Sequence, residues 1–334
     1  MVTSARGLTG IEFVDPALEA SVRAGLERVE STLREAVESG DAFVTEASRH
    51  LVEAGGKRFR PLLALLAAHF GDPLTPEVVQ AAVVVELTHL ATLYHDDVMD
   101  EADVRRGAPS ANSRYTNTVA ILTGDYLFAR ASDIVSELGP EAVKIQSRTF
   151  SRLVTGQIRE TAGPIGDADP VEHYLHVVAE KTGSLIATSG RFGAMFAGAP
   201  APVVETLTKY GEVIGVAFQL SDDLLDIASE SLQSGKTPGT DLREGVPTLP
   251  VLHALASDDP AEARLRELVS RPLVDDDEHS EALDLLRKSP AMATARATLD
   301  SYAAQARALL AELPEVPARA ALESLADFVV ARTG

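Results

Sequence analysis

The sequence has 334 residues, enough for one large or two ordinary domains, and no stretch is rich enough in Gly, Ser or Pro to mark a linker. Its 30 basic and 50 acidic residues give a formal net charge of −20, which argues against nucleic acid and anionic membrane surfaces as partners. It contains no cysteine, so a disulfide framework is excluded, and we expect a cytoplasmic protein.

The apolar runs of the sequence are long but interrupted. Glu86 breaks the longest of them, so no run approaches the ~18 uninterrupted apolar residues of a membrane span. The N-terminus lacks the apolar core of a signal peptide. We therefore predict no transmembrane segment and a single domain over residues 1–334, in which residues 1–14 form a poorly ordered tail.

Capping residues and helix breakers divide most of the chain into helices. The first begins at Asp15-Pro16 and stops at Ser39-Gly40, and the second covers Ala42–Glu53. A third follows the basic turn KRFR, and Thr75-Pro76 begins a central helix that is apolar nearly all round. Further helices are expected over residues 124–138, 141–160, 170–198, 203–229, 248–256, 261–269, 278–288, 291–312 and 318–331. No strand of alternating period is found, so the predicted class is all-α.

One long segment, residues 229–247, carries no helical periodicity. A loop of that length inside a compact domain is usually functional. Gly235, Gly239 and Gly245 give it the freedom to fold over a neighbouring site.

The central helix ends in an acidic cluster. Asp96 and Asp100 are four residues apart and share one helix face, with Asp97 beside them. A solvated acidic patch is one interpretation. The other is a cation site, because the helix that leads into the cluster is expected to be buried. Oxygen ligands without Cys or paired His favour Mg²⁺.

A second acidic cluster lies in VIGVAFQLSDDLLDIAS. Its polar residues recur at i, i+3, i+4 and i+7 from Gln219, and they form one stripe on an otherwise apolar helix. Two such helices facing each other would make a cage of six carboxylates, for which we see no structural reason without metal. The predicted metal ligands are Asp96, Asp97, Asp100, Asp222, Asp223 and Asp226.

With these two motifs, DDVMD and DDLLD, the sequence resembles the all-trans polyprenyl diphosphate synthases of the isoprenoid synthase family. The match extends from about Gly55 to Pro250 in motifs. It implies a helical bundle around a central cavity, three Mg²⁺ ions with substrate bound, and two substrates, isopentenyl diphosphate and an allylic diphosphate. It also implies a homodimer. The helix over residues 78–94, apolar on more than one side, needs cover from the core or from a partner.

A basic turn precedes the third helix. Gly55-Gly56-Lys57-Arg58, with Arg60 close behind, places positive charges and free N–H groups at a helix start, which favours an anion. A solvated basic turn is the alternative. The resemblance implies that Lys57 and Arg58 bind the diphosphate of isopentenyl diphosphate. It also implies that His89 touches this diphosphate, although a lone His on an apolar helix is more often a core residue.

Two arginines follow the first acidic cluster directly. Arg105 and Arg106 can simply neutralise the aspartates. The resemblance implies instead that Arg105 binds the allylic diphosphate and Arg106 the isopentenyl diphosphate. The further allylic diphosphate ligands that it implies are Lys181, Thr182, Gln219 and Lys236, with both lysines counted as catalytic. One departure from the family is Val246, which stands where many relatives have a lysine.

The implied mechanism is electrostatic. Mg²⁺ stabilises the allylic diphosphate as its C–O bond breaks, and the double bond of isopentenyl diphosphate attacks the resulting cation. A class I terpene cyclase would lack the second motif, and a non-catalytic synthase subunit would have lost aspartates from one motif. A helical interaction module would not depend on Mg²⁺. We therefore predict a trans-prenyltransferase.

Product length is predicted from the central helix. If the diphosphate lies at Asp96, the growing chain runs toward the helix N-terminus past Thr88, Ala91 and Thr92, which are all small. Members of the family that this sequence resembles and that stop at about 15 or 20 carbons commonly have a bulky aromatic residue at one of the first two positions, and this chain has none there. The resemblance therefore implies a long-chain product of about 30 to 50 carbons, a quinone side-chain precursor. A geranylgeranyl or farnesyl diphosphate synthase is the alternative. The floor of the tunnel is assigned to the next helix, among Tyr126, Leu127 and Phe128.

Overall fold

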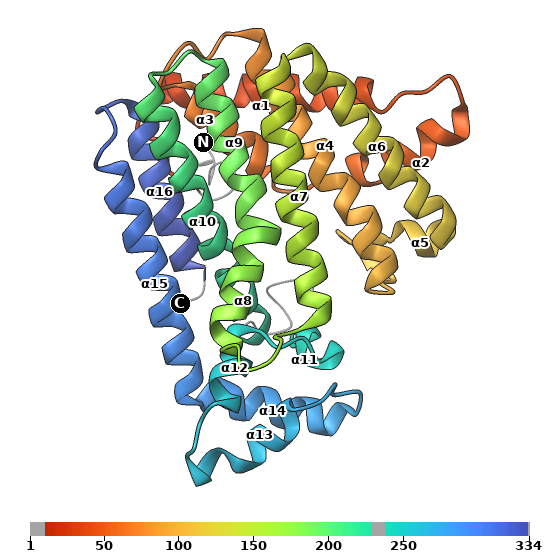
Figure 1. Cartoon of the computed structure of the whole chain (residues 1–334), viewed down its shortest axis with the longest axis vertical. Coiled ribbons are helices and arrows are strands. Elements are labelled where there is room, and N and C mark those ends of the chain that lie inside the picture. The colour runs from red at the N-terminus through yellow and green to blue at the C-terminus, as the bar shows by residue number, and fades with distance from the viewer. Residues whose placement is uncertain (1–10, 229–237, 333–334) are drawn as a thin grey trace, which may run out of the picture. The chain divides into compact units, whose positions relative to one another are not determined.

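The computed structural model describes residues 11–228 and 238–332 (Figure 1). Within these ranges the only strands are β1 (Val104–Arg105) and β2 (Ala108–Pro109), which pair antiparallel. All other regular structure there is helical, so the all-α prediction is confirmed. Gly235, Lys236 and most of the predicted N-terminal tail lie outside the described residues. Ile11, within that predicted tail, is only 1% exposed.

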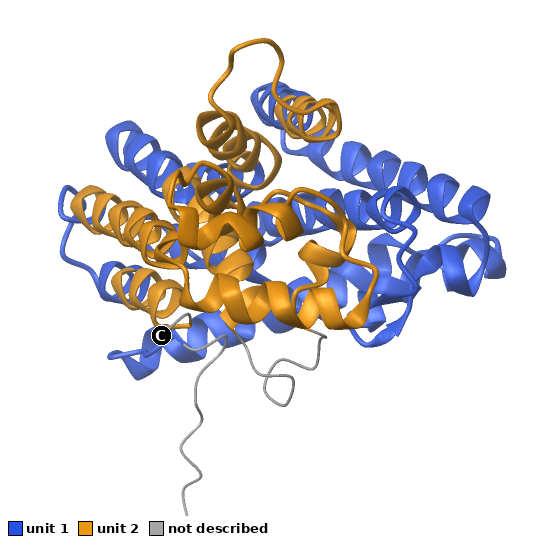
Figure 2. Ribbon diagram, turned by 90° about the horizontal axis from the view of Figure 1, so that it is seen from below, with its two compact units in different colours: residues 1–151, 185–211, 310–322 blue, residues 152–184, 212–309, 323–334 orange. Residues whose placement is uncertain are grey.

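The chain divides into two compact units, which Figure 2 shows in different colours. Unit 1 comprises residues 1–151, 185–211 and 310–322, and unit 2 comprises residues 152–184, 212–309 and 323–334. Each unit is assembled from stretches that are distant in sequence. No linker composition can therefore mark a boundary between them, and the prediction of a single domain stays a prediction.

The first four helices of unit 1 begin and end close to where the sequence predicts. They are α1 (Pro16–Ala36), α2 (Ala42–Glu53), α3 (Phe59–Ala68) and α4 (Pro76–Met99). The Asp15 side chain caps α1 by accepting from the N–H of Ala17 at 2.7 Å. The Asp41 side chain caps α2 in the same way, accepting from Phe43 at 2.8 Å.

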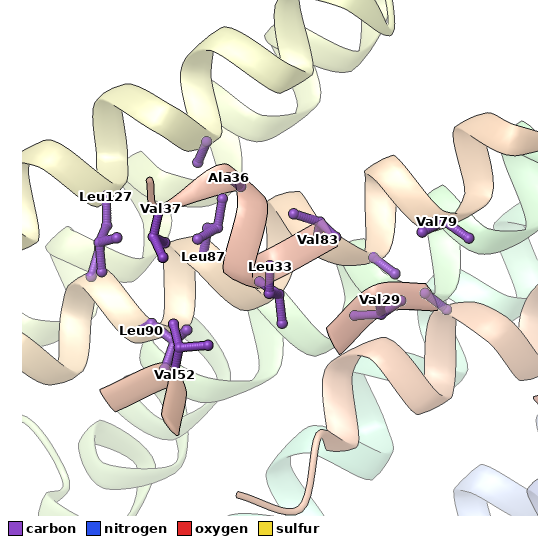
Figure 3. Close-up of a cluster of buried hydrophobic side chains, with 14 of the residues drawn as sticks. Val29, Leu33, Ala36, Val37, Val52, Val79, Val83, Leu87, Leu90 and Leu127 are labelled. Carbon is purple, nitrogen blue, oxygen red and sulfur yellow. The ribbon is translucent and has the colours of Figure 1, made fainter. Parts of the chain in front are cut away.

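Helix α4 forms the centre of the hydrophobic core of unit 1. It packs against α1, α3 and α6 (Asn117–Glu137). Leu33 of α1, Leu87 and Leu90 of α4 and Leu127 of α6 meet there, fully buried (Figure 3). Burying one such leucine contributes about 2 kcal/mol. The apolar faces of residues 78–94 are thus covered by the core of the unit itself.

Helix α4 is long and apolar enough to cross a membrane, yet 72% of its most apolar 18-residue stretch is buried in the structure. Among the described residues it is the only helix with that length and composition. Burial of this kind is expected for a core helix.

Helix α6 begins earlier than the sequence suggests. We predicted a start at Gly124, but Thr116 caps the helix by accepting from the N–H of Val119 at 3.2 Å. Gly124 lies inside α6. A Cβ at this position would lie 2.4 Å from the His95 ring and 3.1 Å from the Ala91 carbonyl oxygen. This glycine therefore allows α6 to approach α4 closely and does not mark a helix start.

The remaining elements complete the two units. Unit 1 also contains α5 (Ala111–Arg114). Residues of both units are found in α7 (Pro140–Ala162), α9 (Ser184–Phe196), α10 (Ala201–Ala228), α15 (Pro290–Leu310) and α16 (Pro317–Ala331). Unit 2 contains α8 (Pro170–Val178), η2 (Ala179–Gly183), α11 (Thr240–Glu244), α12 (Leu249–Leu255), η3 (Pro260–Glu262), α13 (Ala263–Val269) and α14 (Asp276–Lys288).

Two of these elements differ from the prediction. The segment 170–198, predicted as one helix, is divided by the π-helical turn η2. The segment 229–247, predicted as a loop, contains the short helix α11 in its described part.

Candidate active site

The first acidic cluster lies at the C-terminal end of α4. Asp97 is fully buried, and its carboxylate accepts from Arg105 Nε at 2.5 Å and from the N–H of Ala111 at 3.2 Å. Arg105 also lies 3.7 Å from Asp100. Asp97 therefore anchors the segment that follows α4, while Asp96 is partly buried and Asp100, the C-cap residue, is exposed.

The second acidic cluster, on α10, is built in a similar way. Asp223 is buried, and it accepts from Gln219 Nε2 at 2.9 Å and from the Tyr174 hydroxyl of α8. Burial raises the pKa of Asp223 to about 6, against the lowering effect of these two hydrogen bonds. Asp226 accepts from the backbone N–H groups of Thr240 and Asp241 at 3.3 and 3.2 Å, so it holds the start of α11.

The six carboxylates do not form a ready-made metal cage. Across residues 11–228 and 238–332, no group of three His, Cys, Asp or Glu side chains is placed to hold a metal ion. The middle aspartates, Asp97 and Asp223, accept hydrogen bonds from the protein, and the assignment of all six aspartates as ligands stays a prediction. The outer aspartates are Asp96 and Asp100 on α4 in unit 1 and Asp222 and Asp226 on α10 in unit 2, where Asp226 also accepts from the start of α11. Such a pair fits Mg²⁺, which is usually held by one or two carboxylates together with substrate phosphates.

Arg58, predicted as a diphosphate ligand, is bound to the protein itself. Its guanidinium is buried, and it pairs with Glu86 at 2.9 Å and with Glu30, and donates to the Val52 carbonyl at 2.9 Å. Burial lowers the pKa of Arg58, but the hydrogen bonds and charges of Glu30 and Glu86 outweigh burial and raise this pKa overall. Arg58 is therefore bound within the protein, and its role as a diphosphate ligand stays a prediction.

Arg60 belongs to the same basic turn but is not among the predicted ligands. Unlike Arg58, it forms no salt bridge with a glutamate in the described part of the chain. Its side chain is half-buried, and its Nε is inaccessible and has no hydrogen-bond partner in the described part of the chain. Burial lowers the pKa of Arg60 to about 10; the charge of Glu86 opposes this shift, and that of Arg106 adds to it. The sequence signal for Arg60 is that it is the third basic residue of the turn, in the first turn of α3.

Arg58, Arg60, Arg105 and Arg106 form a basic cluster in unit 1 together with His89 of α4. Burial, followed by the charges of Arg60, Arg106, Arg58 and Arg105, holds the pKa of His89 well below its usual range. The imidazole is therefore neutral at neutral pH and surrounded by guanidinium groups. Burying neighbouring positive charges costs free energy, and a bound anion offsets that cost. Such a cluster therefore attracts an anion.

Arg106 fixes the glycine turn that precedes Lys57. Its guanidinium donates to the carbonyl oxygens of Gly55 and Leu51. Gly56 has φ 135°, and a Cβ on it would lie 2.8 Å from the Arg106 guanidinium carbon. The second glycine of the GGKR motif is thus favoured by its backbone conformation, and it lies directly against the Arg106 guanidinium.

Lys181 and Thr182 lie in the π-helical turn η2 of unit 2. Lys181 Nζ pairs with Glu160 at 2.6 Å, and the Thr182 hydroxyl donates to Gln219 Oε1 at 3.3 Å. The structure thus brings Thr182 and Gln219 together with Asp223, as the family pattern implies. Single π-helical turns inside α-helices occur frequently at functional sites.

The three residues predicted to line the product tunnel differ in accessibility. Ala91 is fully buried in the core cluster against α6, and its assignment as tunnel wall stays a prediction. Thr88 is also buried, and it accepts from Gln146 Nε2 of α7 at 2.6 Å. Only Thr92 is partly accessible.

The three floor candidates point to different neighbours. Leu127 lies in the core of unit 1, and the Tyr126 hydroxyl donates to the Glu38 carbonyl at 3.0 Å. The Phe128 ring lies 5.7 Å from His95 of α4 and 4.5 Å from Phe150 of α7. Phe128 is therefore the candidate that lies beside the aspartate-bearing end of α4, and Phe150 is a neighbour that the sequence did not reveal.

Comparisons with known proteins identify relatives of this chain. Residues 41–286 match the family model described as polyprenyl synthetase. The chain is 54% identical to the nonaprenyl diphosphate synthase of Mycobacterium tuberculosis (strain ATCC 25618 / H37Rv) over 335 residues, covering 100% of both chains. It is 34% identical to the octaprenyl diphosphate synthase of Escherichia coli (strain K12), covering 83% of this chain and 86% of the relative.

Solved structures give the same result. The geranylgeranyl pyrophosphate synthase of Corynebacterium glutamicum, complexed with calcium and isoprenyl diphosphate, is 49% identical with a TM-score of 0.88, covering 97% of this chain and 100% of that one. The decaprenyl diphosphate synthase of Rhodobacter capsulatus is 36% identical with a TM-score of 0.86, covering 95% and 99%. The two aspartate motifs, the basic turn and these matches together show that the chain belongs to the polyprenyl synthetase family.

Proposed function

We propose that this chain is a Mg²⁺-dependent trans-prenyltransferase of the cytoplasm that condenses isopentenyl diphosphate with an allylic diphosphate into a long-chain product. The observation that carries the proposal is the basic cluster of unit 1, in which Arg60 has an unpartnered buried Nε beside the neutral His89. This cluster lies on α3 and α4, and α4 also carries Asp96 and Asp100. An anion site and a cation site thus share one rigid helix.

The basic cluster is assigned to the diphosphate of isopentenyl diphosphate. Arg60 and Lys57 supply charge-assisted hydrogen bonds, and the neutral His89 supplies an N–H without adding charge. Arg106 joins them by exchanging the Gly55 carbonyl for a phosphate oxygen. Arg58 keeps the turn in place through Glu30 and Glu86.

The outer aspartates of the two motifs are assigned to Mg²⁺, with three ions bound together with substrate. When bound, Mg²⁺ supplies Lewis-acid stabilisation of the negative charge on the leaving allylic diphosphate. Asp97 and Asp223 hold the geometry of the motifs through Arg105 and Tyr174. Lys181 donates to the allylic diphosphate from η2, and Lys236 is predicted to do so from the segment outside the described residues.

The length of the product is supported by two observations. The relatives from Mycobacterium tuberculosis and Rhodobacter capsulatus are named nonaprenyl and decaprenyl diphosphate synthases. The partly accessible position one turn before Asp96 is Thr92, whose side chain is small. We therefore assign a product of about 30 to 50 carbons, a quinone side-chain precursor, to a tunnel that continues over several helical turns. The structure from Corynebacterium glutamicum, named a geranylgeranyl pyrophosphate synthase, supports the shorter alternative.

The first test supplies isopentenyl diphosphate with allylic primers of different length, with Mg²⁺ or with EDTA. Diphosphate release is expected only with Mg²⁺ and only when both substrates are present. Chromatography of the dephosphorylated products is expected to show chains longer than about 20 carbons, because the wall at Thr92 is open. A hydrocarbon formed from the allylic diphosphate alone would identify a terpene cyclase instead, and turnover in EDTA would contradict the metal assignment.

Product length is expected to change when the wall or the floor changes. Thr92→Phe is expected to shorten the main product, because the ring enters the partly accessible side of α4. Phe128→Ala is expected to lengthen it, since the contact with Phe150 is lost and the floor opens. Ala91→Phe serves as the contrast. It is expected to destabilise the fold by about 1–3 kcal/mol through overpacking at a buried position. Unchanged chain length in both Thr92→Phe and Phe128→Ala would show that these residues do not set the limit.

We propose that the homodimer forms through exposed apolar residues of α6, because the apolar faces of residues 78–94 are covered by the core of unit 1. The exposed apolar side chains Ile121 and Leu122 of α6 are 42% and 60% exposed, and they are adjacent in sequence. Replacing both with serine is expected to convert the sedimenting species to a monomer, because apolar area buried between subunits stabilises association. Val143→Ser, at an exposed position on α7, is the matched control. A wild-type protein that sediments as a monomer at micromolar concentration would rule the proposal out.

A further inference from the structure

The second aspartate motif already has a cation bound to it. Arg332, which follows α16, donates from Nη2 to Asp222 Oδ1, and both residues belong to unit 2. The Arg332 side chain is 9% exposed, against 41% for Asp222. The two residues are far apart in sequence, so the fold of the unit brings them together.

Arg332 is held in this position by packing. Its guanidinium lies 4.7 Å from the ring centre of Phe218 and 5.7 Å from that of Phe328. The Ser221 hydroxyl, next to Asp222, donates to the Val329 carbonyl at 2.7 Å and so ties α10 to α16. Cation–π contacts of this kind stabilise an arginine that has left water.

The arginine is nevertheless incompletely satisfied. Arg332 Nη1 is buried and has no hydrogen-bond partner in the described part of the chain. A buried donor without a partner costs stability, so packing alone does not explain why a guanidinium stands here. Its position at the first aspartate of the motif provides an explanation, because the carboxylates of Asp222, Asp223 and Asp226 are close in sequence and repel one another.

We propose that Arg332 is a positioning residue that acts as the resident counter-cation of Asp222 and weakens the binding of free Mg²⁺ to the second motif. The inference rests on the proposed role of Asp222 as a metal ligand. A guanidinium on Asp222 repels a divalent ion at the same carboxylate. The negative diphosphate of the substrate offsets this repulsion, so the metal binds productively when it arrives with the allylic diphosphate. Arg332 thereby couples metal binding to substrate binding.

The test measures Mn²⁺ binding to the full-length, substrate-free protein by electron paramagnetic resonance. Arg332→Met removes the charge and keeps an apolar stem between the two rings. It is expected to bind Mn²⁺ about tenfold more tightly, as estimated for a unit and a divalent charge roughly 5 Å apart in a water-like dielectric. Arg332→Lys, which keeps the charge, is expected to bind like the wild type. Arg307→Met, which removes an exposed arginine paired with Asp327 in the same unit, is the matched control.

A second measurement follows thermal unfolding. In EDTA, Arg332→Met is expected to melt below the wild type, because Asp222 then loses its ion pair with Arg332. Added Mg²⁺ is expected to raise its melting temperature more than that of the wild type. If Arg332→Met does not fold, Phe328→Leu loosens the arginine and is expected to tighten Mn²⁺ binding severalfold.

The outcomes separate the inference from the proposed function. Unchanged or weaker Mn²⁺ binding in folded Arg332→Met, or in Phe328→Leu when the first variant does not fold, overturns the role of Arg332. Asp222→Asn is measured beside them. If that substitution leaves Mn²⁺ binding at the wild-type level, Asp222 is not a ligand and the metal assignment of the proposed function fails instead.

Discussion

Replacing Asp96 with alanine is expected to lower kcat about a thousandfold, because losing a metal ligand removes several kcal/mol of transition-state stabilisation. Asp96 lies in the last turn of α4 and is only partly buried, so alanine is compatible with the helix. Diphosphate release under saturating substrates measures the effect, and far-ultraviolet circular dichroism checks that the helices remain. Asp222→Ala is expected to show a comparable loss.

The controls for this prediction use other aspartates of the chain. Asp133→Ala removes an exposed carboxylate of α6 that pairs with Arg130 at 3.0 Å, and it is expected to leave kcat unchanged. Asp97→Asn is expected to lower the melting temperature, because its buried carboxylate accepts from both Arg105 and Ala111. More than about a tenth of wild-type activity in both Asp96→Ala and Asp222→Ala would contradict the assignment of the outer aspartates to metal.

The second large effect separates the two arginines of the basic turn. Arg60→Gln is expected to raise the KM for isopentenyl diphosphate about tenfold to a hundredfold, the value of a hydrogen bond to a charged group. The KM for the allylic substrate and the melting temperature are expected to stay near wild-type values. Stability is expected to be unaffected because Arg60 forms no salt bridge within the described residues, where its buried Nε also has no hydrogen-bond partner.

Arg58→Gln is expected to act on stability instead. It leaves Glu86, 1% exposed, as a buried unpaired carboxylate, which costs about 3–5 kcal/mol. Denaturant unfolding measures this loss, and the double variant Arg58→Gln/Glu86→Gln is expected to recover part of it. If Arg58→Gln raised the KM for isopentenyl diphosphate as strongly as Arg60→Gln and left stability intact, Arg58 would be the ligand, as the motif alone suggests.

The sequence alone determined the features that depend on local periodicity. Helix positions follow from residues three and four apart and from capping residues such as Asp15, because backbone hydrogen bonds in a helix join near neighbours. The pairing of Asp96 with Asp100 on one face and the burial of α4 follow in the same way. These features were sufficient to identify the family.

The tertiary structure decided which member of each motif is buried and bound by other segments of the protein. Asp97 and Asp223 are indistinguishable from their neighbours in sequence, and only Arg105 and Tyr174, brought by other segments, give them different roles. In the same way Glu30 and Glu86 form ion pairs with Arg58, a distinction from Arg60 that the basic turn alone does not reveal.

Close packing decided the remaining positions. Gly124 resembles a helix start in sequence but lies inside α6, because only a residue without a side chain can lie against His95. Arg332 reaches Asp222 only through the packing of α16 against α10. Contacts of this kind join residues distant in the chain. They depend on the free energy of the whole packed unit, which local spacing does not encode.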